Sequence, residues 1–183
     1  MRVITGKARG AKLNTLEGIQ TRPTAEKVKE AVFSSLFDKV NCDNVLDVFA
    51  GSGQMGIEAL SRGAKFAVFV EQDRKAVAIV KGNIKTAKLE GQSAVFPTDA
   101  FSFFKSNRTK FDLVFLDPPY NKGLVVSALK AMSEAGTVAD GGTVVCESDK
   151  IDEIPETVGA FKMYKQAFYG RTVISYFVME EEA

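Results

Sequence analysis

The stretch 44–56 constrains this chain more than any other part of it. It starts with an apolar run, 45–49, that is too short for a helix. Gly51, Gly53 and Gly56 follow in the spacing G-x-G-x-x-G, and a helical pattern begins directly after them. This order predicts a buried strand, a tight glycine turn and the start of a helix. Glycines let the backbone approach a ligand closely, and the free N–H groups of the helix start are then expected to face that ligand.

A glutamate at the end of the next apolar run supports a nucleoside-binding site. Glu71 ends the run 65–71 and lies twenty residues after Gly51. A carboxylate at this place can accept hydrogen bonds from the ribose hydroxyls of an adenosine. NAD and S-adenosylmethionine (SAM) both carry that ribose, and a turn without any ligand also fits the glycines alone. Asp47, inside the first strand, and a motif further along the chain distinguish these interpretations.

The charge of the chain is unevenly distributed. The chain has 183 residues, 45% hydrophobic and 26% charged, which suits one globular domain with a sizeable core. Its net charge is +1, but residues 1–29 hold seven basic and two acidic side chains, so this segment is +5 and the remainder −4. We therefore expect one domain, 1–183, in which residues 1–23 form a basic arm that contacts a polyanion. A solvated surface segment is the alternative.

Residues that the sequence lacks exclude several kinds of site. The chain has no histidine, which removes Ser-His and Cys-His catalysis and histidine-ligated metals. Its two cysteines, Cys42 and Cys146, have no metal-site spacing, so we expect no metal, and Cys146 is expected to be a buried small hydrophobe. The N-terminus lacks the apolar region of a secretory signal, and the longest uncharged run, 48–57, is too short to span a bilayer. A cytoplasmic location is the default expectation.

The rest of the chain alternates predicted strands and helices. Residues 2–20 are expected to form short extended pieces with turns at Gly6, Gly10 and Gly18. A helix with one apolar face is expected to run to about residue 37, with either Thr24 as its cap or Pro23 at its first position. After the glycine turn we expect, in chain order, a helix at 57–61, a strand at 65–71, a helix at 74–89, a strand at 94–96, a short aromatic turn or helix at 101–104, a strand at 111–116, a helix at 123–135, a strand at 143–147, and strands at 162–169 and 172–179 joined by Gly170 and Arg171. A two-residue connection that contains glycine predicts an antiparallel hairpin. The predicted fold is thus α/β, a Rossmann-like, doubly wound and mostly parallel sheet with a C-terminal antiparallel hairpin.

The second motif follows the strand 111–116 directly. It reads Asp117-Pro118-Pro119-Tyr120 and lies at the carboxyl end of a strand, where open α/β sheets bind their ligands. Each proline restricts the residue before it, so the Asp117 carboxylate and the nearby carbonyls are held stiffly as acceptors. These acceptors suit a planar NH₂ group, and Tyr120 can stack on the ring that carries it. The alternative is a double proline that only ends the strand, with Tyr120 covering the core.

Several segments together resemble one family of enzymes. The glycine turn with Asp47, Glu71 and the 117–120 motif look like a class I SAM-dependent methyltransferase that methylates amino groups. Further segments are similar to the RsmD family, which methylates N2 of a guanine in small-subunit (16S) ribosomal RNA: they are residues 2–10, 22–24 and 58–64. The resemblance covers nearly the whole chain. Thr5, where a second glycine is common, and the unusual pair Gln54-Met55 depart from the family pattern.

The resemblance implies a role for each group of residues. The motif 117–120 is implied to be catalytic, with Asp117 and the Pro118 carbonyl orienting the guanine N2 while a methyl group is transferred directly from SAM. The residues implied to bind SAM are Asp47, Phe49, Ala50, Gly51, Ser52, Gly53, Gly56, Glu71, Gln72, Asp99 and Ala100. The residues implied to hold the RNA backbone are Arg2, Lys7, Arg9, Lys12 and Arg22. Of the SAM residues, Asp99 is also explained as a plain helix cap. The implied partner is 16S ribosomal RNA within an assembling or assembled small subunit, with no membrane and no obligate protein partner.

Competing interpretations stay open at this point. An NAD(P)-dependent oxidoreductase uses the glycine turn and Glu71 but leaves the 117–120 motif and the basic arm unexplained. A non-catalytic RNA-binding module explains the arm but not the predicted pocket. An enzyme that methylates adenine N6 in DNA or RNA, or a protein glutamine, is the nearest rival. Such enzymes usually have asparagine in place of Asp117.

Overall fold

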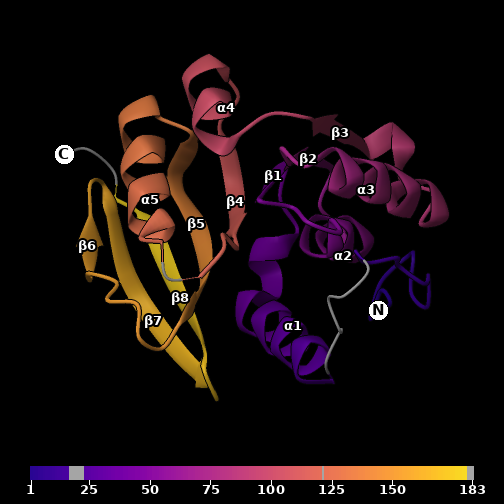
Figure 1. Ribbon diagram of the computed structural model, residues 1–183, viewed down its shortest axis with the longest axis horizontal. Coiled ribbons are helices and arrows are strands. Elements are labelled where there is room, and N and C mark those ends of the chain that lie inside the picture. The colour runs from indigo at the N-terminus through magenta and orange to yellow at the C-terminus, as the bar shows by residue number, and fades with distance from the viewer. Residues whose placement is uncertain (17–22, 121, 181–183) are drawn as a thin grey trace.

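The strands form one sheet that is parallel in its first part and antiparallel in its second. The computed structural model describes residues 1–16, 23–120 and 122–180, and in these residues an eight-stranded sheet has the order β3-β2-β1-β4-β5-β8-β7-β6 (Figure 1). The first five strands pair in parallel, while β8, β7 and β6 are antiparallel. The strands are β1 Asn44–Val48, β2 Phe66–Val70, β3 Ser93–Phe96, β4 Phe111–Leu116, β5 Val138–Asp149, β6 Thr157–Val158, β7 Phe161–Tyr169 and β8 Thr172–Met179. The predicted fold class and the C-terminal hairpin are confirmed.

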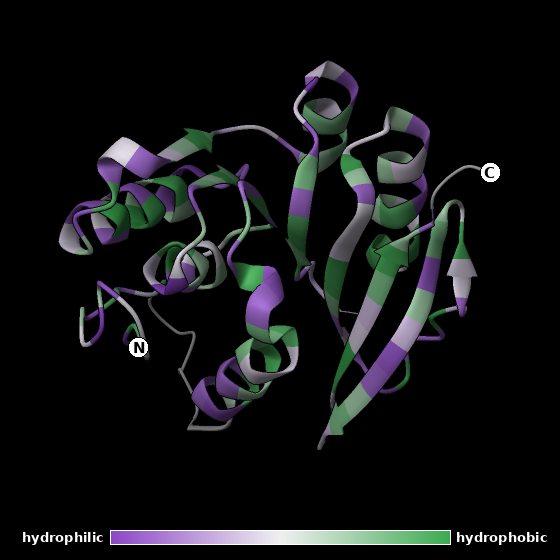
Figure 2. Cartoon of the chain, turned by 180° about the vertical axis from the view of Figure 1, so that it is seen from behind, coloured by the Kyte–Doolittle hydropathy of each residue, from purple (hydrophilic) through white to green (hydrophobic). Residues whose placement is uncertain are grey.

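Helices cover both faces of this sheet and enclose two apolar cores. The helices are α1 Pro23–Leu36, α2 Gln54–Arg62, α3 Arg74–Thr86, α4 Ala100–Ser106 and α5 Leu124–Ala135, with short 3-10 helices at Phe37–Val40 and Glu90–Gln92. One core joins apolar side chains of α1, α2 and α3 to the sheet, and the other joins those of α4 and α5. Because successive strand residues point to opposite faces, neighbours such as Val45 and Leu46 enter different cores. The central strands therefore show as nearly continuous hydrophobic runs, whereas the outer strand β7 alternates (Figure 2).

The structure changes the bounds of several predicted elements. Strand β5 is longer than predicted, because it pairs with β4 at Val138 and again from Thr143, and the glycines at 141–142 lie at the shift of register between these contacts. Helix α2 begins at Gln54, immediately after Gly53. Helix α3 ends at Thr86, and Phe101, Phe103 and Phe104 belong to a true helix, α4, that packs into the core. The short strand β6 was not predicted.

A buried ion pair ties the N-terminal segment to the helices. Glu58, which is fully buried in α2, accepts hydrogen bonds from the backbone N–H groups of Ile4 at 2.9 Å and Thr5 at 3.0 Å. The ammonium of Lys29 lies 3.4 Å from the same carboxylate, and the Arg62 guanidinium donates to it at 2.8 Å. Burial lowers the pKa of Lys29, and the Glu58 charge opposes that shift. Lys29 is thus part of the interior, so its charge, counted in the +5 of residues 1–29, does not lie on the surface.

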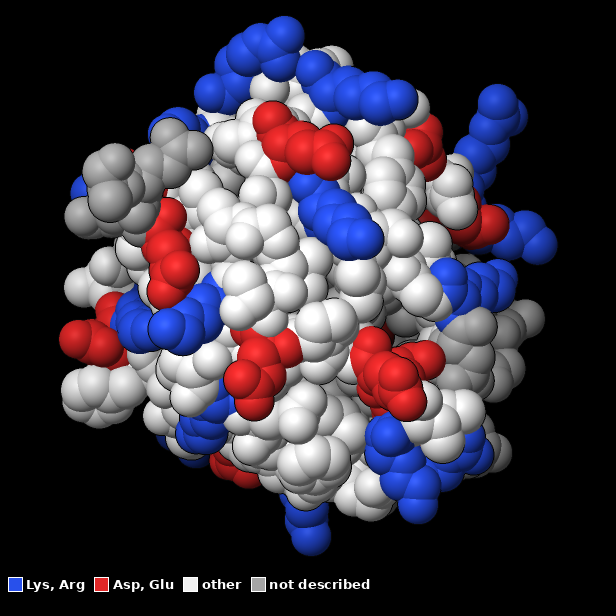
Figure 3. All heavy atoms as spheres, turned by 90° about the vertical axis from the view of Figure 1, so that its left-hand side faces the viewer, with Lys and Arg blue, Asp and Glu red and all other residues white. Residues whose placement is uncertain are grey.

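The surface around β6, at one edge of the sheet, carries mixed charges. Figure 3 shows this side of the molecule, where lysine and arginine side chains alternate with aspartate and glutamate around a largely uncharged centre. No helix among residues 1–16, 23–120 and 122–180 is long and apolar enough to cross a membrane. Within the same ranges no group of three or more histidine, cysteine or acidic residues could hold a metal ion.

Candidate active site

The site lies where the direction of strand order reverses. Strand β1 has β2 on one side and β4 on the other, and both pairs are parallel, so the loops after β1, β2 and β4 leave the same edge of the sheet. Ligands of open α/β sheets bind at such a switch point. The glycine turn follows β1, and the motif 117–120 follows β4, so the fold places the two predicted motifs next to each other.

A buried acid in β1 accepts a hydrogen bond from the glycine turn. Asp47, only 3% exposed, accepts a hydrogen bond from the Gly56 N–H at 2.9 Å. Burial raises the pKa of Asp47 to about 7; the Glu71 charge adds to the shift and the Gly56 N–H opposes it. We expected the N–H groups at the start of α2 to face a ligand, but that of Gly56 points instead to Asp47. The predicted contact of Asp47 with SAM stays a prediction.

Two glycines of the turn are required for different reasons. Gly53 has φ +77°, a left-handed conformation that favours glycine, and caps the start of α2. Gly56 is helical, but a Cβ on it would lie 2.4 Å from the Phe69 ring. Glycine at position 56 therefore lets α2 pack closely on β2. The adjacent Ser52 carbonyl accepts a hydrogen bond at 2.8 Å from Asn83 of α3, which also bonds Asn14 of the N-terminal segment.

Glu71 joins the glycine turn to the loop after β2. Its carboxylate accepts one hydrogen bond from the Gly51 N–H and one from the Asp73 N–H, each at 2.9 Å. Beside it opens a cavity of about 130 Å³, and five of the residues predicted to bind SAM line this cavity: Phe49, Glu71, Gln72, Asp99 and Ala100. Tertiary structure thus gathers the predicted adenosine side of the site in one place.

Asp99 caps helix α4, as the alternative interpretation held. Its carboxylate accepts a hydrogen bond from the Ser102 N–H at 3.0 Å. The Ser102 donors lower the pKa of Asp99. Asp99 nevertheless lines the small cavity, so capping and ligand contact are compatible.

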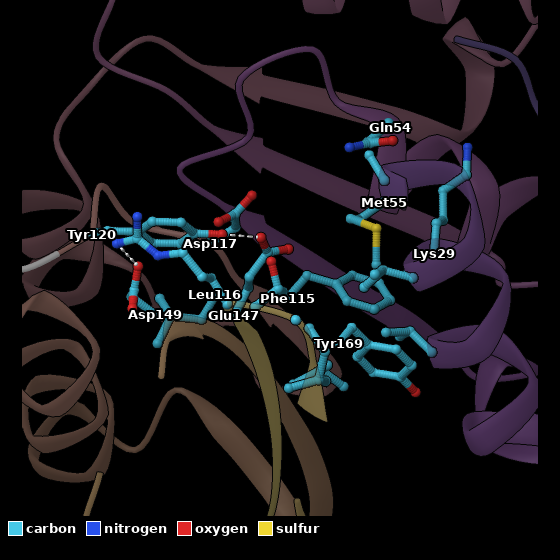
Figure 4. Close-up of a pocket in the computed structure, with 18 of the residues that line it drawn as sticks. Lys29, Gln54, Met55, Phe115, Leu116, Asp117, Tyr120, Glu147, Asp149 and Tyr169 are labelled. Carbon is cyan, nitrogen blue, oxygen red and sulfur yellow. Dashed lines mark hydrogen bonds and ion pairs between the residues drawn. The ribbon is translucent and has the colours of Figure 1, made fainter. Parts of the chain in front are cut away.

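A larger cavity of about 690 Å³ lies between helices α1 and α2 and strands β4, β5 and β8. It extends from Gln54 and Met55, between Gly53 and Gly56 of the glycine turn, to Tyr169 and Arg171 at the tip of the C-terminal hairpin. Figure 4 shows polar groups after β4 and at the end of β5 on one wall and residues of α1 and α2 on the other. Ligand pockets commonly have volumes of about 300–1,000 Å³, so this cavity suits a ligand of the size of a nucleotide.

Asp117 and Tyr120 of the predicted motif both line this cavity. Asp117 keeps an exposed surface toward the pocket, yet protein atoms surround its carboxyl, and this burial with the nearby Glu147 charge raises its pKa well above the ordinary range. Tyr120 is 37% exposed, and its hydroxyl donates a hydrogen bond to Glu147. Burial and Glu147 raise the pKa of the Tyr120 hydroxyl. Pro118 and Pro119 line a small adjoining cavity behind Tyr120.

Sequence reasoning missed Glu147. This residue lies in β5, and the parallel register pairs Leu116 of β4 with Cys146 of β5, so Asp117 and Glu147 are the next residues along the two strands. Burial raises the pKa of Glu147, although the Tyr120 hydroxyl opposes the shift. A signal was present, because the predicted strand 143–147 ended on this acid. Cys146 beside it is buried, as predicted.

A second unpredicted pair lies at the tip of the hairpin. The Arg171 guanidinium is 2.7 Å from the carboxylate of Asp149, whose side chain is 2% exposed, and both residues line the large cavity (Figure 4). The Arg171 side chain is 72% exposed, so it lies at the rim. Strand pairing between β5 and β8 creates this contact across 22 residues of sequence, which a local pattern does not reveal.

The basic residues predicted to contact RNA lie on the N-terminal segment. Arg9 and Lys12 are exposed, Arg2 lies 4.0 Å from Glu26, and the Lys7 ammonium donates to Gln92. Arg22 and Gly18 fall outside the described residues. The RNA contacts stay a prediction.

Comparison with known proteins gives the chain full-length relatives. The family model described as conserved hypothetical protein 95 matches residues 1–178. The chain is 39% identical to the Bacillus subtilis protein YlbH, with 96% of this chain and 97% of that protein covered. It is 32% identical to ribosomal RNA small subunit methyltransferase D of Escherichia coli K12, with 100% and 91% covered. The solved structure of the Escherichia coli protein yhhF superimposes with a TM-score of 0.89 at 31% identity, covering 100% of this chain and 99% of that one.

Proposed function

The chain belongs to the family described as conserved hypothetical protein 95, and we propose that it is an enzyme that transfers a methyl group from SAM to the exocyclic N2 of a guanine in small-subunit (16S) ribosomal RNA. A relative with 32% identity over the whole chain bears the name of a small-subunit ribosomal RNA methyltransferase. The observation that carries the proposal is the placement of Asp117 and Tyr120 in a cavity that begins at the glycine turn. The family membership and this geometry favour the methyltransferase over the oxidoreductase and the binding module.

The residues of the glycine side fit SAM. The small cavity has an acid, Glu71, where a ribose is expected, and we place the adenine against Asp99 and Ala100, which line the same cavity. A Cβ on Gly51 would meet no atom closer than 3.9 Å, so the turn leaves open space above its backbone. When bound, SAM supplies a methyl group that its sulfonium has already activated. The chain's own residues then have to bind and orient the acceptor.

Asp117 and Tyr120 orient the acceptor in this proposal. The guanine ring stacks on Tyr120, while the Asp117 carboxylate and the Pro118 carbonyl accept hydrogen bonds from the N2 amino group. The N2 lone pair is delocalised into the ring, and these acceptors favour a more pyramidal nitrogen as attack proceeds, which stabilises the transition state. The N2 nitrogen forms the new C–N bond while the S–C bond breaks with its electron pair returning to sulfur. One N2 proton leaves to Asp117 or to water.

The remaining parts of the proposal concern the substrate and its setting. We propose one domain, 1–183, whose N-terminal arm contacts the RNA backbone through Arg2, Lys7, Arg9, Lys12 and Arg22. A guanine that is stacked or paired must leave its position to reach Tyr120, at a cost of a few kcal/mol. The substrate setting is an assembling or assembled small subunit in the cytoplasm.

The test is transfer of a tritiated methyl group from SAM to unmodified small ribosomal subunits, with bare 16S RNA and DNA in parallel, followed by digestion to nucleosides. We expect label in N2-methylguanosine and in ribosomal RNA only. An Asp117→Ala reaction serves as the control that the label depends on this site. Label in adenine or in DNA would overturn the guanine assignment, and the absence of label from every nucleic acid would overturn the RNA substrate.

A further inference from the structure

Two acids stand side by side in the large cavity with few hydrogen-bond donors of their own. Asp117 and Glu147 occupy the next positions after the paired residues Leu116 and Cys146. Among the described residues, no donor bonds the Asp117 carboxylate, and only the Tyr120 hydroxyl bonds that of Glu147, at Oε1. Two adjacent carboxylates facing one pocket are unfavourable without donors, because like charges repel and burial penalises both. The wall therefore suits a ligand that presents two adjacent donors.

The Watson–Crick edge of guanine presents this pattern. Its N1–H and its N2 amino group are neighbouring donors, whereas adenine has a bare N1 lone pair beside its N6 amino group. A site with buried acceptors discriminates strongly against a base that lacks the matching donor. We propose that Glu147 is the specificity-determining residue, which accepts a hydrogen bond from guanine N1–H while Asp117 accepts from the N2 amino group. This inference rests on the proposed function.

The contact with Tyr120 is compatible with this role. The Tyr120 hydroxyl engages Oε1 of Glu147 and leaves Oε2 for the base. The same contact offers a simpler explanation, in which Glu147 only positions the Tyr120 ring. Glutamine at position 147 separates the two, because its amide oxygen still accepts from the Tyr120 hydroxyl while its amide nitrogen presents a donor to the base.

The experiment uses 2-aminopurine, a base that keeps the exocyclic amine but has a lone pair in place of N1–H. Small subunits are reconstituted with 16S RNA that carries guanine or 2-aminopurine at the methylated position, and kcat/KM is measured for both. We expect the wild-type enzyme to prefer guanine by about 100-fold or more. Glu147→Gln is expected to lower kcat/KM for the guanine substrate and to raise it for the 2-aminopurine substrate. The preference for guanine should fall at least about tenfold, a change of about 1.4 kcal/mol. Because 2-aminopurine also lacks O6 for both enzymes, the change in the preference isolates the N1 contact.

Tyr120→Phe is the matched control, since it removes the hydroxyl contact and keeps the Glu147 carboxylate. We expect it to alter the rate but to leave the preference for guanine unchanged. An unchanged preference in Glu147→Gln, or an equal change in Tyr120→Phe, would overturn the inference. If Glu147→Gln does not fold, a wild-type enzyme that methylates 2-aminopurine as readily as guanine would overturn it equally. A wild-type enzyme that methylates no guanine would instead refute the proposed function.

Discussion

The acids on the two sides of the site differ in their hydrogen bonds to the backbone. On the glycine side, Asp47, Glu71 and Asp99 each accept hydrogen bonds from backbone N–H groups. On the hairpin side, Asp117 and Glu147 face the large cavity, and within the described ranges no backbone N–H donates to either carboxylate. The first group shapes loops and helix starts before any ligand arrives, whereas the second group is left for donors of the ligand.

This difference matches the sequence distance over which each contact forms. The Asp47 and Asp99 contacts span nine and three residues, and the Glu71 contacts span twenty and two. Asp117 and Glu147 are brought together across a helix by the pairing of β4 with β5. The comparison indicates that the glycine side is preorganised by local bonds, while the hairpin side carries electrostatic strain that a guanine edge relieves. Four variants test this contrast, starting with the largest expected effect.

Removing the Asp117 carboxylate is expected to impair turnover on the hairpin side of the site and to leave SAM binding on the glycine side intact. Asp117→Ala should lower kcat by about 100- to 1,000-fold, the usual effect of losing one group that stabilises a transition state. Its affinity for SAM, measured by calorimetry, should stay within about twofold, because the glycine side is intact. The control is Asp112→Ala on the same strand, whose carboxylate bonds the Asn44 N–H at 2.9 Å at the other end. Equal losses of turnover and SAM affinity in Asp117→Ala would contradict the contrast.

The buried acid of the glycine side should make stability depend on pH. The pKa of Asp47 is raised from 3.8 to about 7 in the folded state, so its contribution to stability is complete below about pH 4 and is lost as the pH rises through 7. When the pH is raised from 5 to 8, ionisation of this residue should lower the free energy of unfolding of the wild type by about 2–3 kcal/mol. Asp47→Asn should not show this decrease. Urea unfolding at the two pH values measures the difference. Asp43→Asn, at an exposed acid before β1, should follow the wild type; a parallel decline in all three proteins would refute the assignment.

Glu71 should affect SAM binding rather than turnover. Glu71→Ala removes the carboxylate that is expected to accept from the ribose hydroxyls of SAM, and a hydrogen bond to a charged group contributes about 1.5–3 kcal/mol, so we expect SAM affinity to fall about 10- to 100-fold. At saturating SAM the value of kcat should return to near that of the wild type. Asp73→Ala, which loses the cap of α3 but not the cavity wall, is the control. A kcat that stays low at saturating SAM would place Glu71 in the chemistry and remove the contrast.

The basic arm should contribute the smallest effect of the four. Arg9→Ala should weaken RNA binding a few-fold and reduce the slope of log affinity against log salt by about 1, since one phosphate contact is lost. Filter binding of 16S RNA over a salt series gives the slope. Lys130→Ala on α5, which covers the opposite face of the sheet, is the control and should leave the slope unchanged. Identical slopes for Arg9→Ala and the wild type would exclude Arg9 from the RNA contact.

Local patterns were sufficient for most of the elements and for the two motifs. Neighbouring residues alone were enough to predict the strand before the glycines, the position of Glu71 and the end of β4 at the prolines. The bounds of β4 were predicted to the residue. Errors lie where tertiary contacts override such patterns. Strand β5 continues through the glycines at 141–142 because β4 pairs with it before and after them, and the N–H of Gly56 is taken by a side chain from β1.

The sequence by itself determined the doubly wound sheet, the glycine turn and the acceptor motif, because hydrophobic periodicity and backbone preferences act over a few residues. Only the tertiary structure decided which side chains complete the site. It buried Lys29 against Glu58 and set Glu147 beside Asp117. Both contacts join residues about thirty positions apart, and the register of packed elements, which no local pattern specifies, places them together.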